Sequence, residues 1–184
     1  MTAVHKYFFA PRAKSFWQPI GRYVFTFGLL EKDIDEAVTT LLEINHQLMG
    51  QMAMSQINSV NAKIKLLPAL TRVATIDGTK IKEMKDLTTK LEDQSTFRNY
   101  LVHGPWTGYM HPSKEREAGW QKFRISNRFK SFFWKVTVSE INSHSDELEN
   151  LSEALQRLIS SVCADRAAGR VPSPDKLLEL SVGE

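Results

Sequence analysis

Apolar side chains recur at three- and four-residue spacing along four stretches of the chain, which is typical of amphipathic helices. The first stretch follows Pro19 and predicts a helix of about seven or eight turns. Pro19 fits the first turn, where a backbone N–H has no helical partner in any case. Gly50 is expected to end this helix. Its apolar positions are Ile20, Val24, Phe27, Ile34, Val38, Leu41, Leu42, Leu48 and Met49.

Two further helices are predicted in the middle of the chain. The second covers the apolar positions of residues 57–67 and meets a stop or a kink at Pro68. The third starts near Thr79 and runs to His103. The Gly-Pro pair at 104–105 then ends it, with glycine just past the last turn and proline beyond.

The chain before the last helix has a different pattern. Residues 104–119 are rich in Gly, Pro and Ser and predict a loop. Residues 120–126 and 134–139 alternate between apolar and polar positions, which predicts a small β-hairpin. A final helix is indicated by the leucines and other apolar residues of 148–162, with Ser145 as its N-cap.

The predicted fold is therefore all-α, an up-and-down bundle of four main helices with a small loop or β-hairpin insertion before the last helix. We expect residues 1–168 to form a single helical domain and residues 169–184 a C-terminal tail. A chain of 184 residues with 42% hydrophobic and 24% charged residues has an ordinary globular composition and can bury a core.

Composition excludes several classes of protein. The single cysteine, Cys163, argues against a disulfide framework or a Cys-based metal site and is expected in the core of the last helix. The histidines have no metal-ligand spacing, so neither a metal site nor a cofactor is expected. The N-terminal apolar run is too short for a signal peptide, and no stretch approaches the roughly 20 apolar residues that cross a bilayer. We expect a soluble, cytoplasmic protein that makes no membrane contact.

The net charge of +3 is mild, but the charges are unevenly distributed. Basic residues concentrate between Lys114 and Lys135 among several aromatic residues, whereas residues 140–153 are acidic. Such a basic, aromatic stretch can contact an RNA backbone and stack bases. Alternatively, the aromatic rings pack the insertion onto its domain and the basic residues form a solvated rim. The candidate RNA-binding residues are Lys122, Arg124, Arg128 and Lys130.

The end of the third helix, FRNYLVHGPW (97–106), carries the candidate chemistry. Asn99 and His103 are four residues apart and therefore neighbours on a helix. Arg98 is further around, but its long side chain can converge with them on a ligand lying across the helix end. A guanidinium matches phosphate oxygens, and an imidazole exchanges protons near neutral pH. The set can thus deprotonate a ribose 2′-hydroxyl and stabilise charge at phosphorus without a metal.

A simpler interpretation applies to the same residues. Arg and His near the last turn of a helix stabilise the negative end of its dipole, by about 0.3–1 kcal/mol each. Glu31 lies on the apolar stripe of the first helix, where an unpaired buried carboxylate would be costly. We hypothesise that Glu31 contacts Arg98 or His103 and orients it. Alternatively, Glu31 lies at the exposed edge of the stripe and reaches water.

The sequence RNYLVHG (98–104), which closes a helix in an all-helical chain, resembles the Arg–polar–x3–His motif of the HEPN superfamily. These are ribonuclease or nucleotide-binding domains of higher eukaryotes and prokaryotes. The segment FGLLEKDIDEAVTTLLEIN also resembles the first helix of HEPN-like proteins. The likeness covers roughly residues 20–165 in pattern, and its specific part is the short motif. Residues 1–168 would then be a HEPN-like domain.

The resemblance assigns a role to each motif residue. Arg98 would bind and stabilise the scissile phosphate, His103 would act as general acid or base, and Asn99 would position them. Family members commonly form homodimers in which two motifs face each other, and the products implied are a 2′,3′-cyclic phosphate and a 5′-hydroxyl. Many HEPN toxins carry a tyrosine two residues after the histidine. This chain has Pro105 there, so regulation through that tyrosine is not expected.

Two functions are compatible with these patterns. The first is a metal-independent endoribonuclease of HEPN type that acts as a homodimer on RNA, in toxin–antitoxin systems or antiviral defence, with an antitoxin or defence protein as partner. The second is a catalytically inactive HEPN-like helical module that binds a protein or a nucleotide, since several superfamily members have the fold without the nuclease activity.

Overall fold

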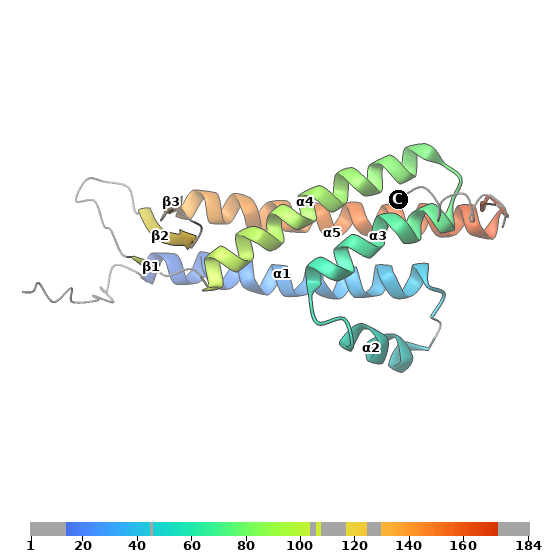
Figure 1. The fold of residues 1–184 in the computed structure, drawn as a ribbon, viewed down its shortest axis with the longest axis horizontal. Coiled ribbons are helices and arrows are strands. Elements are labelled where there is room, and N and C mark those ends of the chain that lie inside the picture. Colours follow the sequence, from blue (N-terminus) through green and yellow to red (C-terminus); the bar gives the residue numbers. More distant parts are fainter. Residues whose placement is uncertain (1–13, 45, 104–105, 108–116, 125–129, 173–184) are drawn as a thin grey trace, which may run out of the picture. The chain divides into compact units, whose positions relative to one another are not determined.

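The structure, a computed structural model, describes residues 14–44, 46–103, 106–107, 117–124 and 130–172. These residues form the predicted all-α helical bundle with a small antiparallel β-insertion before the last helix (Figure 1). The main helices are α1 (Lys14–Leu41), α3 (Val60–Ala74), α4 (Gly78–His103) and α5 (Val138–Ala167), and α2 (Gln47–Ser55) is a short additional helix. The strands are β1 (Trp106–Thr107), β2 (Glu117–Arg124) and β3 (Lys130–Thr137).

The chain divides into two compact units. The first unit consists of residues 1–27 and 96–147, and the second of residues 28–95 and 148–184. Each unit buries its own apolar side chains at helical spacing, as the sequence pattern predicts. The buried core of the first unit includes Tyr23, Phe27, Phe97, Leu101, Val136 and Ile141.

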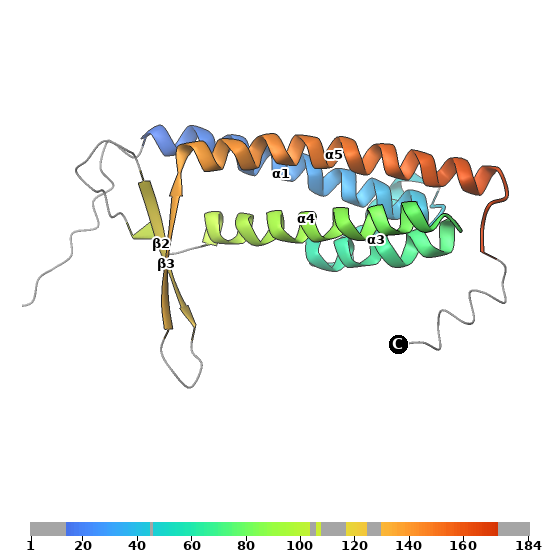
Figure 2. The same cartoon turned by 90° about the horizontal axis from the view of Figure 1, so that it is seen from above.

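The second unit is a bundle of four helix segments with α2 attached. Its α3 and α4 segments run side by side in both views (Figures 1 and 2). The side chain of Asp33 accepts a hydrogen bond from Ser152, which joins α1 to α5. The core is aliphatic and includes Leu30, Ile34, Val38, Leu41, Ile64, Leu67, Met84, Leu91, Leu148, Leu155 and Val162.

The long first helix of the prediction is in fact two helices. The first, α1, ends at Leu41, and Glu43 then adopts a left-handed backbone conformation with φ 58°, which an α-helix does not allow. Residues 48–49, assigned to the apolar stripe of the first helix, belong to α2 and are exposed. Gly50 does not break a helix but lies buried within α2. A Cβ there would lie 3.1 Å from Thr39 Cγ2, so the close approach of α2 to α1 favours glycine.

Two prolines lie inside helices rather than at their ends. Helix α1 begins at Lys14, before Pro19, and α3 continues past Pro68 to Ala74. The prediction of Pro19 in the first turn was therefore wrong, and of the two alternatives for Pro68, a stop or a kink, the stop is excluded. A proline removes one backbone hydrogen bond of a helix. In α3 the burial of Thr71 and Ala74 beyond the proline offsets that loss.

The third helix and the hairpin are where the sequence predicts them, with shifted ends. Helix α4 starts one residue before the predicted start. Strands β2 and β3 pair antiparallel, and β1 adds to β2 in the order β1-β2-β3 (Figure 2). Thus β1 and the start of β2 occupy part of the predicted loop. The register places Trp120 opposite both Trp106 and Trp134, and aromatic residues at cross-strand positions favour pairing.

Helix α5 begins earlier than predicted. Thr137 and Glu140 form a capping box: the Thr137 amide donates to Glu140 Oε2 at 2.6 Å, and the Glu140 amide donates to Thr137 Oγ1 at 3.1 Å. Ser145 is instead buried within α5, where its hydroxyl donates to the Ile141 carbonyl at 2.9 Å. The assignment of Ser145 as N-cap was therefore wrong, because residues 137–140 supply the complete Thr-x-x-Glu start signal.

We expect Thr137→Ala to lower the free energy of unfolding by about 1 kcal/mol, because it removes the side-chain acceptor of the cap. Urea unfolding followed by circular dichroism measures the change. Thr89→Ala is the matched control, since Thr89 is exposed in the middle of α4 and alanine favours helix there. An equal loss in both variants would contradict a capping role for Thr137.

The first residues of the predicted C-terminal tail are fixed to the second unit. Gly169 has φ 71° and terminates α5 in a Schellman arrangement. The Arg170 amide donates to the Asp165 carbonyl at 2.9 Å, and the Gly169 amide donates to that of Arg166 at 3.0 Å. Glycine is required at position 169 because L side chains rarely adopt this conformation. Residues 173–184 lie outside the described part of the chain.

Candidate functional site

The end of α4 brings the three predicted motif residues together. Arg98 is half-buried, whereas Asn99 and His103 are exposed. Arg98 Nη1 lies 3.2 Å from His103 Nε2 and 3.4 Å from Asn99 Oδ1. A permanent cation and an imidazole therefore meet on the surface of the first unit, where a ligand can reach them.

Arg98 is the residue that connects the motif. Helical spacing makes Asn99 and His103 neighbours, and the long Arg98 side chain, which starts further around the helix, reaches both. A guanidinium only donates hydrogen bonds, so His103 accepts through Nε2 and carries its proton on Nδ1 in this contact. A phosphate would compete for the guanidinium, because its oxygens match the planar fork of donors. Its arrival would free the Nε2 lone pair of His103 for proton transfer.

A cluster of three rings supports the helix turn that carries Arg98. Phe97 stacks on His144 of α5 with ring centroids 3.8 Å apart, and Tyr23 of α1 packs edge-on against Phe97 at 5.1 Å. Tyr23 is fully buried. Neither Tyr23 nor His144 is among the core or site residues predicted from the sequence. Both lie one helical turn from apolar core positions, Leu148 and Phe27, which is the signal that could have placed them inside.

Burial shifts the pKa values of the two titratable rings of this cluster so that the neutral forms are favoured near pH 7, and neighbouring charges oppose these shifts only in part. Burial raises the pKa of the Tyr23 phenol well above its usual range, and nearby Arg98 opposes this less strongly. Burial lowers the pKa of the His144 imidazole, and Glu147 and Glu140 counteract it in part. Glu147 Oε2 lies 3.8 Å from His144 Nδ1. The cluster is therefore a neutral support beside a charged guanidinium.

The lowered pKa of His144 predicts a pH-dependent stability. Below about pH 6.5 the unfolded state binds a proton that the folded state resists, so the free energy of unfolding should fall as the pH drops from 7.5 to 5.5. In His144→Phe, which keeps a ring for stacking, this fall should be smaller. Urea midpoints across this range measure it, with His46→Gln, an exposed histidine, as control. An unchanged pH dependence in His144→Phe would contradict the assignment.

The other predicted site residues are placed differently. Glu31 lies half-buried in the second unit, so its contact with Arg98 or His103 in the first unit stays a prediction. Lys122 and Arg124 lie in β2, and Lys130 lies in β3 opposite Arg124. The register thus brings two of the candidate RNA-binding positions next to each other. Arg128 falls outside the described residues.

A second charged cluster lies in the second unit and was missed by sequence analysis. The Asp165 side chain is 5% exposed and accepts hydrogen bonds from Lys80 Nζ at 2.7 Å, from Thr75 Oγ1 at 2.7 Å and from Arg170 Nη2 at 2.7 Å. The hydrogen bond from Lys80 is the largest of the effects that hold the pKa of Asp165 well below its usual range. The cluster joins the α3–α4 connection, the first turn of α4 and the end of α5. All three side chains donate to Asp165, and Lys80 Nζ also donates to the Ser161 carbonyl of α5 at 3.0 Å, so we interpret the cluster as a structural anchor.

Two other features, a metal-binding cluster and a membrane-crossing helix, are absent from the described residues. Within the described ranges, no three His, Cys, Asp or Glu side chains are close enough together to hold a metal ion. Among the helices as described, none combines the length and the apolar character needed to cross a membrane. Cys163 lies in the last helix, α5, as expected, but it is half-buried and not part of the core.

Comparison of the chain with protein-family models, with curated proteins and with solved structures finds no match. The case for a function therefore depends on the geometry of the residues themselves.

Proposed function

We propose that the protein is a metal-independent endoribonuclease of HEPN type that acts as a homodimer. The observation that carries this proposal is the 3.2 Å contact between Arg98 Nη1 and His103 Nε2. A permanent cation and a proton-transfer group this close together would both reach one bound phosphodiester. The proposed substrate is RNA, because the reaction uses the ribose 2′-hydroxyl as its nucleophile.

In the proposed reaction, His103 Nε2 takes the proton of the 2′-hydroxyl. The 2′-oxygen forms a bond to phosphorus, and the bond between phosphorus and the 5′-oxygen breaks. The leaving 5′-oxygen takes a proton from a second imidazole in its protonated form, the partner's His103. The products are a 2′,3′-cyclic phosphate and a 5′-hydroxyl, with the proton count balanced between the two histidines.

Arg98 contributes by binding charge that develops on the non-bridging phosphate oxygens. Its guanidinium offers donors beyond the one directed at His103, so it can hold the phosphate in two places. Asn99 supports this role because its Oδ1 accepts from the same guanidinium nitrogen at 3.4 Å. The ring cluster of Tyr23, Phe97 and His144 fixes the backbone from which Arg98 extends, and a rigid support favours catalysis.

Further parts of the chain have proposed roles in the same reaction. The basic positions of the hairpin, Lys122, Arg124, Arg128 and Lys130, would bind the RNA backbone on either side of the scissile bond. Glu31 would orient Arg98 or His103. A cytoplasmic role in toxin–antitoxin or antiviral defence would require a partner protein that restrains the activity.

The test is cleavage of a defined single-stranded RNA by the purified chain in EDTA. Mass spectrometry of the fragments should find 2′,3′-cyclic phosphate and 5′-hydroxyl ends, and RNA with 2′-O-methyl groups should remain intact. Cleavage that requires added metal, or fragments with 5′-phosphate ends, would contradict the proposed chemistry.

One observation favours a second candidate, a catalytically inactive interaction module. Several large apolar side chains are exposed in both units, among them Phe25 at 69% and Met52 at 62%. Exposed apolar patches commonly mark protein-binding surfaces. A chain that binds a protein partner but leaves RNA intact in EDTA would favour this function over the nuclease.

A further inference from the structure

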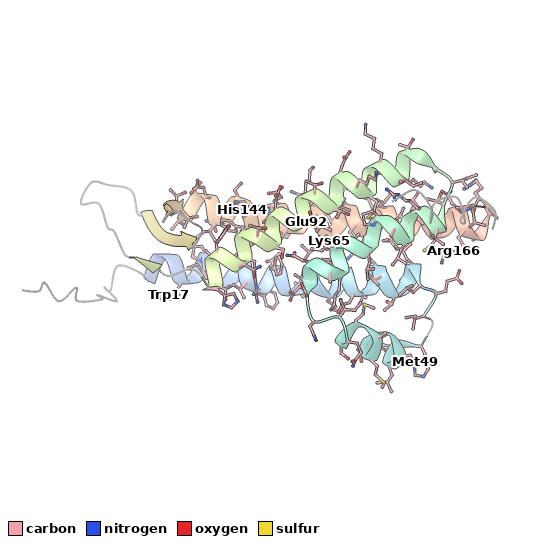
Figure 3. The ribbon with its side chains drawn as sticks, viewed as in Figure 1. Trp17, Met49, Lys65, Glu92, His144 and Arg166 are labelled. Carbon is pink, nitrogen blue, oxygen red and sulfur yellow. The ribbon has the colours of Figure 1, made fainter. Side chains whose placement is uncertain are left out.

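The outward face of α1 in the first unit carries large apolar side chains that are exposed. Trp17 is 55% exposed, Val24 38% and Phe25 69% (Figure 3 labels Trp17). Tyr23 and Phe27 are buried on the inward side of the same helix segment. Large apolar side chains that gather on an exposed face commonly mark an interaction surface. A second surface is therefore expected to cover this face.

The face has a particular shape, which we call the Trp-Gly-Phe stripe: Trp17, Gly21 and Phe25, each one helical turn from the next. A Cβ placed on Gly21 would meet no atom within 4 Å, so the notch between the two rings is open. The order of side-chain sizes, large at Trp17, small at Gly21 and large at Phe25, is the same in both directions along the helix. Two copies of the stripe running antiparallel are therefore complementary to each other.

We propose that the stripe is the contact surface between two copies of this chain. The two α1 helices cross at Gly21, where the glycines let the backbones approach, and Trp17 of one copy packs on the partner's Phe25. By symmetry the contact occurs twice, which is how two-fold interfaces are built. Aromatic residues at the centre of an interface commonly dominate its binding energy.

Charge and area favour a second copy over other occupants. Among the side chains that the structure describes beside the stripe, Arg22 is charged and is paired with Asp146 at 2.8 Å, so two copies would not repel each other there. The exposed parts of Trp17, Val24 and Phe25 amount to about 300 Å² per copy, taking 150–250 Å² for a whole aromatic side chain. This is enough for the apolar centre of an interface of about 800 Å² per partner, with a polar rim.

The inference deepens the proposed function, and its consequence for cleavage rests on that function. The stripe and the Arg98–His103 pair belong to the same unit. On the inward side of this segment of α1, Tyr23 packs on Phe97, next to Arg98 in the sequence. A dimer through the stripe would therefore pair two copies of the unit that holds the motif.

The experiment measures the mass of the full-length chain by analytical ultracentrifugation over a range of concentrations. Wild type should be a dimer, and Gly21→Leu should weaken dimerisation at least tenfold because its side chain fills the notch. In the monomer the new side chain meets open space, and leucine favours helix more than glycine does, so the fold should be retained. Phe25→Asp should also give monomers. Val73→Asp, at an apolar position 48% exposed on α3, is the matched control and should remain dimeric.

Thermal unfolding separates lost dimerisation from misfolding. The wild-type Tm should rise with protein concentration, and that of Gly21→Leu should be independent of concentration with an unchanged helical spectrum. A monomeric wild type, or a dimer unaffected by both stripe substitutions, would overturn the inference. So would a wild-type monomer that binds anionic phospholipid vesicles through Phe25, since a membrane would then be the occupant.

RNA cleavage by the same proteins distinguishes the inference from the proposed function. If both substitutions disrupt a wild-type dimer that never cuts RNA, the stripe is the dimer contact and the proposed nuclease function is wrong. Monomeric variants that cut RNA as well as wild type would also support the stripe as the dimer contact. They would contradict a catalytic site built from the motifs of two copies.

Discussion

Replacing either Arg98 or His103 by alanine is expected to lower the rate of RNA cleavage by about 10²–10⁴-fold. Each substitution removes one half of the proposed chemistry, the charge-binding guanidinium or the proton-transfer imidazole. Neither residue belongs to the buried core, so the free energy of unfolding should change by less than about 1 kcal/mol. Single-turnover cleavage of a labelled RNA in EDTA measures the rate, and urea unfolding measures the stability.

Two further variants make this result specific. Arg98→Lys keeps the charge but loses the planar fork of donors, so it should recover only a small part of the activity. Arg157→Ala, at an exposed position of α5 in the second unit, should cleave like wild type. Full activity in Arg98→Ala or His103→Ala would show that the motif only terminates a helix.

Replacing Asp165 by asparagine is expected to give the largest loss of stability. The carboxylate is buried and accepts from three side chains, and its removal leaves the Lys80 ammonium, 18% exposed, without its counter-charge. Breaking a buried pair from one side is strongly destabilising, and we expect Tm to fall by on the order of 10 °C. Asp146→Asn is the control, because its ion pair with Arg22 is largely exposed and should contribute little.

The pH dependence gives an independent check on Asp165. Its folded pKa is depressed, so its contribution is fully present above the unfolded pKa of about 3.9 and is lost as the pH falls from there toward the folded value. The difference in stability between wild type and Asp165→Asn should therefore be constant from pH 7 to 5 and shrink below pH 4. A difference that stays constant down to pH 2.5 would contradict the assignment.

The parts of the fold that the sequence predicts are those encoded by local pattern. The apolar spacing of α4 and the Gly-Pro pair after it define that helix almost to the residue, and the alternation around Trp120 and Trp134 predicts the hairpin. The end of α1 could not be predicted in this way. It depends on the backbone of Glu43 and on a contact between Gly50 and Thr39, which no spacing rule contains.

In the candidate site, too, some features follow from local sequence and others depend on tertiary packing. Arg98, Asn99 and His103 lie within six residues of one helix, so their proximity follows from the sequence. The support from Tyr23 and His144 comes from two other helices and depends on tertiary packing. The anchor at Asp165 likewise could not be predicted from the sequence, because Thr75 and Lys80 are far from it along the chain.

The most direct test is histidine side-chain NMR of the full-length chain during titration with a 2′-O-methyl dinucleotide, which binds like RNA but cannot be cleaved. We predict a saturable shift of the His103 ring signals in wild type and a much smaller shift in Arg98→Ala at the same concentrations, because the guanidinium holds the phosphate against the imidazole. His103 signals that stay unchanged while the dinucleotide binds elsewhere on the protein would contradict a phosphodiester site at the end of α4.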